Sequence, residues 1–259
     1  MTRRHIKLKG AHNFRDIGGY TLDSGKRIKT RMIFRSDRLS KLTTSDLRYF
    51  EALNIKLIID LRDDYERHSD PSRLPQNNTP TTKVLSLHNN RMDIRTLKQQ
   101  LFAGKLGQFD FHEFLLSEYR HYITQHDNEL KKIFTLLLDP GRYPVLIHCN
   151  GGKDRTGTVT ALIHYALGLR KETIFDDYML SGDNLKRLVK KTLIQVKLFS
   201  LFRANTRQLK PLMETHPEYL QEAINTMERN FGSIDAYLNH LGMHQYGRKQ
   251  LCDILCHQP

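Results

Sequence analysis

Residues Tyr143-Pro-Val-Leu-Ile-His-Cys-Asn-Gly-Gly-Lys-Asp-Arg-Thr-Gly157 decide the fold that this sequence predicts. The apolar run that ends at His148 is typical of a buried strand. A glycine-rich turn follows it directly. The residues from about Thr156 to Leu167 then have the apolar spacing of a helix, which we expect to end near Gly168. A strand that leads through a tight turn into a helix is the unit from which parallel, helix-covered sheets are built.

The same alternation is found elsewhere in the chain. Further strands are expected at residues 31–35, 55–61 and 82–87, and helices at residues 43–53, 184–202, 218–230 and 233–241. Thr44 or Ser45 is the expected cap of the first of these helices, and Ser233 of the last. The proline-rich stretch 69–80 is expected to be a surface loop. We therefore predict an α/β fold with a central, mostly parallel sheet flanked by helices, and a largely helical last third.

Composition excludes several classes of protein. Of the 259 residues, 39% are hydrophobic, which suffices for a core, and no stretch approaches a membrane span of about 18 consecutive apolar residues. The basic start MTRRHIKLKG lacks the apolar run of a secretory signal peptide. Cys149, Cys252 and Cys256 have neither the number of a disulfide framework nor the spacing of a zinc site. Free thiols of this kind are expected in a reducing compartment.

The charge of the chain is strongly positive. Lys and Arg number 41 against 28 Asp and Glu, which gives a net charge of +13. Such a balance fits a phosphorylated substrate, an anionic membrane surface, nucleic acid, or solubility alone. We expect no nucleic-acid partner, because the sequence has no aromatic RNA-binding signature, no zinc-finger spacing and no Trp.

The turn after His148 has the residues of an anion site. Backbone N–H groups of a tight turn converge on one anion, and the start of the next helix adds positive potential there. Gly151 and Gly152 permit such a turn, and the planar guanidinium of Arg155 binds two phosphoryl oxygens at once. Cys149 faces the same field and is expected as a thiolate, the form that attacks phosphorus. The alternative is a buried structural cysteine beside a glycine turn.

The segment His148–Gly157 resembles the active-site loop of the protein tyrosine phosphatase superfamily. It is most similar to a bacterial branch with Lys-Asp before the arginine, which includes lipid-active phosphatases secreted by intracellular pathogens. Asn13-Phe-Arg-Asp-Ile-Gly-Gly-Tyr20 matches the N-terminal signature of that branch, and residues 34–39 and 59–62 also fit. The resemblance covers residues 10–182, and more loosely residues up to 242. Asn150-Gly151 replaces the apolar residue and alanine that are common in the branch.

This resemblance implies a cysteine-phosphatase fold and a role for each residue of the loop. Cys149 would form a phosphocysteine intermediate, and Arg155 would bind the phosphoryl group and stabilise the transition state. The chain has no Trp and therefore lacks the Trp-Pro-Asp loop of many relatives. The branch implies Asp154 as general acid instead. Asp154 as a mere helix cap is the alternative, and Asp60 and Asp63 are reserve acids. No metal or other cofactor is expected.

The remaining loop residues would bind the substrate. Asn150, Gly151 and Gly152 would surround the phosphoryl group together with Lys153 and Thr156. In the related branch, a lysine at position 153 accompanies activity on phosphoinositides as well as phosphotyrosine; its alternative is a solvated loop lysine. Thr156 would donate a hydrogen bond to the cysteine sulfur, or cap the helix. His148 would order the loop or be purely structural.

The substrate expected is phosphotyrosine, with phosphoserine, phosphothreonine and phosphoinositides as further substrates. The alternative function is a catalytically weak protein that binds a phospho-ligand or a membrane surface. Arg15 and Asp16 are expected to pair and brace the active-site loop, and Arg62 to line the cleft. The basic helix at 184–202 would be a lid, a segment lying on an anionic membrane, or an ordinary packed helix.

The chain as a whole is expected to be one phosphatase domain, residues 1–259, with a helical lid or extension at about 184–230. We expect it in the cytoplasm, or secreted into a host cell by a route without a recognisable signal peptide.

Overall fold

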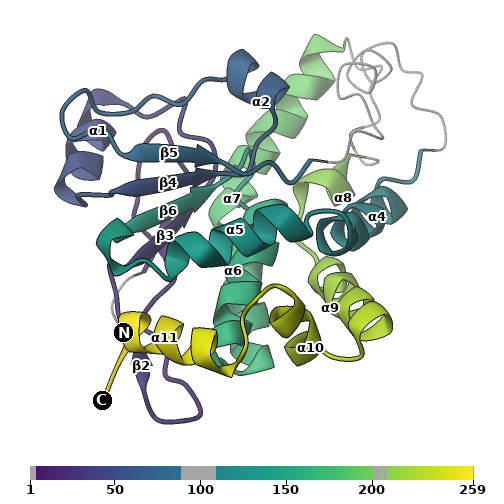
Figure 1. Ribbon diagram of the computed structural model, residues 1–259. Helices are drawn as coiled ribbons and strands as arrows, with labels where there is room; N and C mark the ends of the chain where they lie inside the picture. The colour runs from purple at the N-terminus through teal and green to yellow at the C-terminus, as the bar shows by residue number, and fades with distance from the viewer. Residues whose placement is uncertain (1–3, 89–108, 201–205, 207–208, 259) are drawn as a thin grey trace.

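The main sheet is mostly parallel, as the sequence predicts. The computed structural model describes residues 4–88, 109–200, 206 and 209–258 (Figure 1). Within them the sheet has the strand order β1-β3-β6-β4-β5. Its members are β1 (Arg15–Asp16), β3 (Ile33–Ser36), β4 (Leu57–Asp60), β5 (Thr81–Val84) and β6 (Val145–His148). All neighbours are parallel except β1 and β3. The central strand β6 therefore ends between its neighbours, immediately before Cys149.

Helices cover both faces of this sheet. They are α1 (Thr44–Ala52), α2 (Asp64–Ser69), α4 (Phe111–Thr124), α5 (Asp127–Leu137), the short 3₁₀ helix η1 (Pro140–Arg142), α6 (Asp154–Leu167), α7 (Lys171–Phe199), α8 (Lys210–Met213), α9 (Pro217–Phe231), α10 (Ile234–His240) and α11 (Gln245–Leu255). Successive side chains along the strands point to opposite faces of the sheet and so enter two different hydrophobic cores. Val145 and Ile147 join the larger core with α4–α6 and α9–α11, while Leu146 and Ile58 join a smaller core with α1 (Figure 1).

A second, two-stranded sheet joins the two ends of the described chain. Its strands are β2 (Arg27–Ile28) and β7 (Cys256–His257), which pair in antiparallel fashion. Figure 1 shows β2 beside α11, at the end of the molecule where the described chain ends. Among the described residues, every helix is too short or too polar to cross a bilayer.

The predicted cap of α1 is wrong. Neither Thr44 nor Ser45 caps the helix, because the extended backbone of Thr43 (φ −79°, ψ 169°) makes it the residue before the first turn. Its hydroxyl accepts from the Asp46 amide, and the Asp46 carboxylate accepts from the Thr43 amide at 2.9 Å. This reciprocal capping satisfies two amides that a helix start leaves without partners. The predicted cap Ser233 is confirmed by its 3.0 Å bond from the Ala236 amide.

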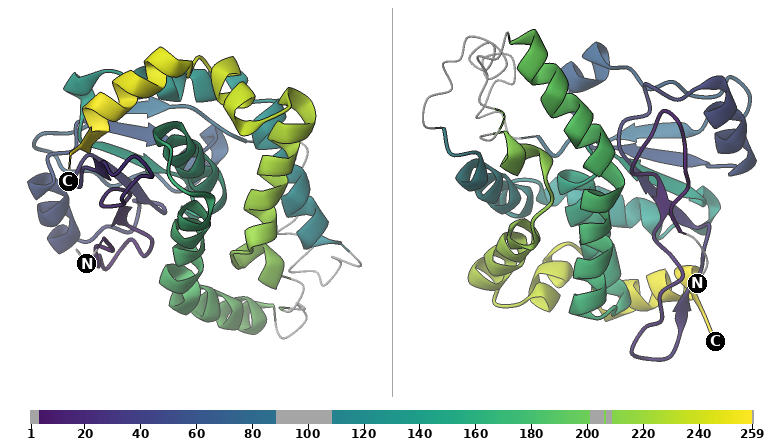
Figure 2. Two further views of the ribbon diagram at one scale, coloured as in Figure 1. Left: turned by 90° about the horizontal axis from the view of Figure 1, so that it is seen from below. Right: turned by 180° about the vertical axis from the view of Figure 1, so that it is seen from behind.

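Helix α7 begins 13 residues earlier than the sequence predicts. It runs unbroken from Lys171 to Phe199, and the predicted positions 201 and 202 lie outside the described residues. The buried positions Ile174, Tyr178, Ser181 and Leu185 follow the alternating spacing of four and three that marks a helix face. Figure 2 shows the C-terminal half of α7 extending beyond the sheet.

A buried ion cluster ties α7 to the sheet. One carboxylate oxygen of Asp177 lies 3.4 Å from Nη2 of Arg15 and 3.1 Å from Nη1 of Arg35. All three side chains are almost inaccessible to solvent. Burial alone would raise the pKa of Asp177, but the charges of Arg15 and Arg35 lower it far below its ordinary value. The carboxylate therefore stays ionised and balances part of the buried positive charge.

The expected Arg15–Asp16 pair is not formed. Arg15 reaches Asp177 and the Ser181 hydroxyl, whereas the Asp16 carboxylate accepts from the backbone amides of Gly18 and Arg31. The reason is geometric: residues 15 and 16 are neighbours on a strand, so their side chains point to opposite faces of the sheet.

Replacing Asp177 by Asn is expected to lower the free energy of unfolding by about 3–5 kcal/mol, since it leaves two buried guanidinium groups without a counter-charge. The folded-state pKa of Asp177 is depressed, so its stabilisation is complete above the unfolded value of 3.8 and is lost as pH falls through and below it. Urea unfolding at pH 7 and at acid pH should show the difference between wild type and variant shrinking below about pH 4. The exposed neighbour Asp176→Asn is the matched control; equal effects of the two substitutions would contradict the proposed role of the cluster.

Candidate active site

The loop between β6 and α6 and the first two residues of α6, together residues 149–155, are the centre of the site and are called the anion loop below. Cys149 follows the last residue of β6 and is 2% exposed. The Gly152 amide donates to the Cys149 sulfur at 3.2 Å. Helix α6 begins at Asp154, so its positive N-terminal end lies in the loop itself. The sulfur thus lies where backbone N–H groups and the helix dipole both favour an anion.

The turn at Gly152 is held from outside the loop. The Gly152 carbonyl oxygen accepts from Nη2 of Arg35 at 2.8 Å and from the Asn13 side-chain amide at 2.8 Å. Gly152 has φ +64°, and a Cβ at this position would lie 2.4 Å from the Ser36 carbonyl oxygen. Only glycine fits there. The N-terminal motif therefore braces the loop, as expected, but through Asn13 and through Arg15, which bonds Asn13.

Glu66 of α2 holds Arg155 in place. Its two carboxylate oxygens accept from the two Nη atoms of Arg155 at 2.6 and 2.8 Å, and the Leu61 carbonyl accepts a further bond at 3.3 Å. Burial opposes the charge of Glu66, but these bonds lower its pKa below the ordinary value. Such a two-pronged pair fixes the plane of the guanidinium. Glu66 is not among the residues predicted from the sequence, although the spacing Asp63-x-x-Glu66, typical of a helix start, is a signal that points to it.

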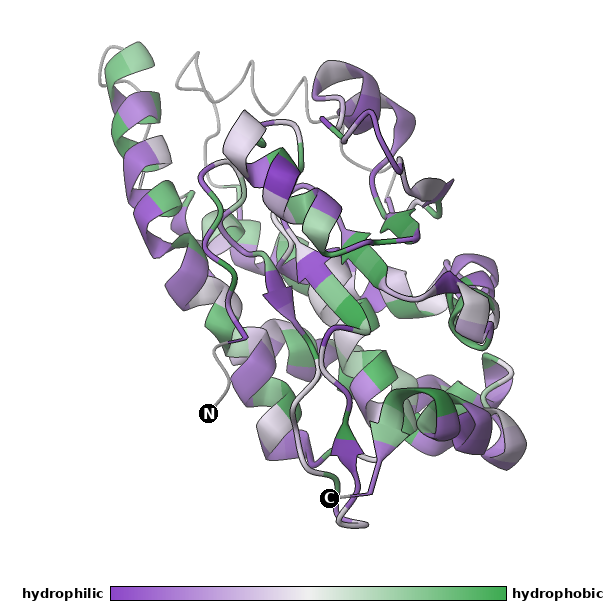
Figure 3. Ribbon diagram, turned by 90° about the vertical axis from the view of Figure 1, so that its left-hand side faces the viewer, coloured by the Kyte–Doolittle hydropathy of each residue, from purple (hydrophilic) through white to green (hydrophobic). Residues whose placement is uncertain are grey.

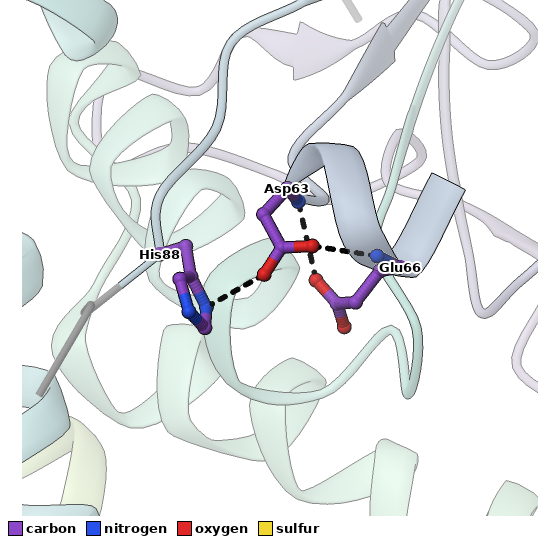
Figure 4. Close-up of side chains that lie close together, drawn as sticks. All are labelled: Asp63, Glu66 and His88. Carbon is purple, nitrogen blue, oxygen red and sulfur yellow. Dashed lines mark hydrogen bonds and ion pairs between the residues drawn. The ribbon is translucent and has the colours of Figure 1, made fainter. Parts of the chain in front are cut away.

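Asp63, Glu66 and His88 form a cluster at the edge of the site (Figure 4). Their oxygen and nitrogen atoms lie within 4.8 Å of one another, a spacing that a metal ion could use. Hydrogen bonds account for the cluster: the Glu66 amide donates to Asp63 at 2.6 Å, the Asp63 amide donates to Glu66 at 3.2 Å, and Nδ1 of His88 lies 3.2 Å from Asp63. Since Glu66 also binds Arg155, the cluster supports the guanidinium.

Asp154 faces the cavity and not only the helix start. One of its carboxylate oxygens accepts from the Tyr119 hydroxyl at 2.9 Å and from Lys153 Nζ at 2.8 Å. The Tyr119 hydroxyl is also 2.7 Å from that of Tyr178. Burial, aided by the Asp154 charge, raises the pKa of Tyr119 well above its ordinary value, so its proton remains available to the carboxylate. Two buried tyrosines thus orient Asp154 from behind.

Two adjoining cavities open over the anion loop, and together they are called the cleft. The first, of about 300 Å³, is lined by Lys153, Asp154 and Arg155 together with Glu66 and His88. The second, of about 240 Å³, has an apolar wall from α7 that consists of Leu185, Leu188 and Val189. Both include Asn150, Gly151, Lys153 and Leu212 among their linings. The cleft therefore offers cations at its base and an apolar wall at one side.

Asp60 and Arg62 lie away from the cleft. Two nitrogens of Arg62 bond the Asp60 carboxylate at 2.8–3.2 Å, and both side chains line a separate cavity beside His148. The expectation that Arg62 lines the cleft is therefore wrong, because its buried charge is satisfied by Asp60 on the other side of the strand ends. Asp60 is distant from the cleft for the same reason.

His148 and Thr156 are fully buried behind the loop. Nδ1 of His148 lies 3.3 Å from the Cys149 carbonyl oxygen, and Nε2 lies 3.5 Å from Asp60. Burial lowers the pKa of His148, so the ring is neutral at neutral pH. The Thr156 hydroxyl has no hydrogen-bond partner among the described residues. The hydroxyl group of Thr156, one residue past Arg155, therefore remains available to donate a hydrogen bond.

Comparison with known proteins finds sequence similarity along nearly the whole chain. The sequence model of a family described as "Tyrosine phosphatase family" matches residues 6–257. The chain is 28% identical to the triple specificity protein phosphatase PtpB of Mycobacterium tuberculosis, over 92% of this chain and 94% of that protein. It is 25% identical to a putative tyrosine-protein phosphatase of Cupriavidus necator, over 91% and 83% of the two chains.

A shorter match links the chain to an inositol diphosphatase. SIW14 of Saccharomyces cerevisiae is 41% identical over 49 residues, which are 19% of this chain and 17% of that protein. The crystal structure of the core catalytic domain of SIW14, described as a PP-IP phosphatase in complex with citrate, aligns with a TM-score of 0.37 at 19% identity. That alignment covers 80% of this chain and 88% of the other.

Replacing Gly152 by Ala is expected to weaken binding of the oxyanion tungstate at least about tenfold, because the added Cβ meets backbone and the loop must shift. Gly151→Ala is the matched control: its Cβ would lie 3.7 Å from the nearest atom, in ordinary contact with Lys153. Isothermal titration calorimetry measures both affinities, and thermal unfolding checks that both variants fold. Equal tungstate affinity in the two folded variants would refute the role assigned to Gly152.

Proposed function

The chain belongs to the tyrosine phosphatase family, and from this membership we propose that Cys149, Asp154 and Arg155 hydrolyse phosphomonoesters without a metal. The observation that carries the proposal is the convergence of three groups on one loop: a sulfur that accepts from a backbone amide, a fixed guanidinium and a carboxylate in the cavity. These groups supply the nucleophile, the anion-binding group and the acid that phosphoryl transfer needs.

The proposed reaction has two steps. In the first, a lone pair of the Cys149 thiolate forms a bond to phosphorus while the ester P–O bond breaks. Asp154 gives its proton to the leaving oxygen, so that the alcohol departs neutral and a phosphocysteine remains. In the second, Asp154 takes a proton from a water molecule that attacks phosphorus, the P–S bond breaks, and the thiolate and inorganic phosphate are regenerated. Arg155 and the loop amides bind the phosphoryl oxygens throughout.

Lys153 and the shape of the cleft support more than one substrate class. Lys153 is only 5% exposed, yet it lines both cavities, where its ammonium, 2.8 Å from Asp154, is a second cation beside Arg155. A second cation favours multiply phosphorylated ligands. The relatives are named as a triple specificity phosphatase and an inositol diphosphatase. We propose phosphotyrosine as substrate, with phosphoserine, phosphothreonine and phosphoinositides as further substrates. Asn150, Gly151, Gly152 and Thr156 complete the proposed binding loop.

One phosphatase domain is proposed for residues 1–259, with the second half of α7 and the residues up to about 230 as its helical extension. The larger core supports this, since it includes side chains from the sheet, from α4–α6 and from α9–α11. Parts of the extension, residues 201–205 and 207–208, lie outside the described residues. Cys149, Cys252 and Cys256 are all free thiols, which supports a reducing compartment. The absence of a nucleic-acid partner stays a prediction.

Cys149→Ser is expected to lower kcat on para-nitrophenyl phosphate by about four orders of magnitude or more, since a serine hydroxyl cannot supply the thiolate. Tungstate affinity should remain within a few-fold of wild type, because Arg155 and the loop amides are unchanged. Rapid mixing of wild type with this substrate should give a burst of released nitrophenolate and a trapped phosphocysteine. A wild type that binds tungstate without turnover would instead support the phospho-ligand-binding alternative.

Asp154→Asn is expected to lower kcat on phosphotyrosine peptides by about 10²–10⁴. On para-nitrophenyl phosphate the loss should be much smaller, because nitrophenolate departs without a proton. Asp63→Asn is the matched comparison, as Asp63 lies at the cleft edge, hydrogen-bonded to α2 and beside His88. If Asp63→Asn and not Asp154→Asn shows this dependence on the leaving group, the acid is Asp63. Steady-state kinetics with both substrates measures the two variants.

A further inference from the structure

The outward face of α7 carries charged and apolar side chains together. With about 3.6 residues per turn, seven positions of its C-terminal half fall within an arc of roughly 140°. All seven are exposed, and they are called the outer face below: Lys186, Arg187, Lys190, Lys191, Ile194, Lys197 and Leu198. Figure 3 shows this half of α7 as alternating hydrophilic and hydrophobic bands that project away from the body of the protein.

Ile194 lies near the middle of this face and Leu198 lies toward one edge of it. They are 51% and 55% exposed, and the next residue, Phe199, is 76% exposed. Being four residues apart, Ile194 and Leu198 are neighbours on the helix surface. The other large apolar side chains that are exposed among the described residues lie singly, on other elements. A lone exposed apolar residue needs no explanation, but two that are neighbours on one helix face and are surrounded by cations form a surface suited to an interaction.

The charge of the C-terminal half of α7, after Asp183, has one sign. The 16 residues from Asn184 to Phe199 include five Lys and Arg and no Asp or Glu. Arg187, Lys190 and Lys191 make no ion pair within the described part of the chain. A second copy docked by the same face would oppose cation to cation, which disfavours self-association. The complementary partner is a negatively charged surface that also accepts apolar side chains.

The opposite face of the same helix is already in use. Leu185, Leu188, Val189 and Thr192 line the cleft. Contact with the active site therefore does not explain the exposed Ile194 and Leu198, which lie on the other side of the helix.

We propose that the outer face docks α7 onto an anionic lipid bilayer. The helix would lie in the plane of the membrane, with Ile194 and Leu198 at the boundary of headgroups and acyl chains and the lysines and Arg187 beside lipid phosphates. Because the opposite face of α7 lines the cleft, docking through the outer face would place the helix between the bilayer and the cleft. The docking does not rest on the catalytic assignment, and vesicle binding tests it whether or not the protein turns over substrate.

The test is cosedimentation of the full chain with vesicles of phosphatidylcholine, with and without phosphatidylserine, at low and physiological salt. Wild type is expected to bind only the vesicles that contain phosphatidylserine. Arg187→Gln, Lys190→Gln and Lys191→Gln combined should weaken binding about a hundredfold, at about fivefold per cation. Ile194→Ser with Leu198→Ser should weaken it about tenfold or more, and the remaining binding should vanish at physiological salt.

Matched controls lie on other elements. Tyr246→Ser removes an apolar side chain that is 79% exposed, and Lys132→Gln with Lys249→Gln removes two exposed cations. Both controls should bind within about twofold of wild type, since neither touches the outer face. Turnover of para-nitrophenyl phosphate, or the thermal unfolding midpoint if turnover is absent, should be unchanged in every variant.

Three results would overturn the proposal. If wild type fails to bind phosphatidylserine vesicles at low salt, the outer face is not a membrane-docking surface. Equal losses in the controls and in the outer-face variants would show adsorption by total charge. A dimer in analytical ultracentrifugation that Ile194→Ser with Leu198→Ser dissociates would assign the face to a second copy of the chain.

Discussion

The site depends on one carbonyl group, that of Gly152. Because its oxygen accepts from both Arg35 and Asn13, the peptide units on either side are fixed, and the Gly152 amide is directed at the Cys149 sulfur. A buried guanidinium needs a counter-charge, and Asp177 supplies it to Arg35 from α7. Burial lowers the pKa of Arg35 to about 10, which still leaves the group charged at neutral pH. An interior charge network thus determines the shape of a loop at the surface.

Two of the three catalytic groups proposed here are held by a residue from another element. Arg155 is held by Glu66 of α2, and Asp154 by Tyr119 of α4. Tyr119 in turn contacts Tyr178 of α7, whose ring lies where a Cβ on Gly157 would clash at 2.9 Å. Such support matters because phosphoryl transfer gains most from groups that are positioned before the substrate arrives. The cavity walls therefore belong to the same framework that stabilises the fold.

The sequence could predict those features that depend on neighbours along the chain. The strand, glycine turn and helix around Cys149 are local, and so are the Ser233 cap and the alternation that gives a parallel sheet. The partners of buried charges could not be predicted in this way. Arg15 and Asp177 are 162 residues apart, and nothing local distinguishes the buried Asp177 from the exposed Asp176 except the helical spacing of Ile174, Tyr178 and Ser181. Glu66 was missed because its short helix α2 has too few residues to show a period.

The residues that hold the anion loop in place also limit which exchanges of sequence between proteins can preserve the proposed activity. The anion loop is a run of seven residues, but its conformation depends on residues far from it in the sequence. Asn13 and Arg35, near one end of the chain, bond the loop, and Asp177, two thirds of the way along the chain, bonds Arg35. Grafting the seven residues alone onto an unrelated scaffold would transfer the sequence of the loop without its conformation. Recombination between distant homologues would succeed only where the crossover keeps the N-terminal segment and α7 from the same parent.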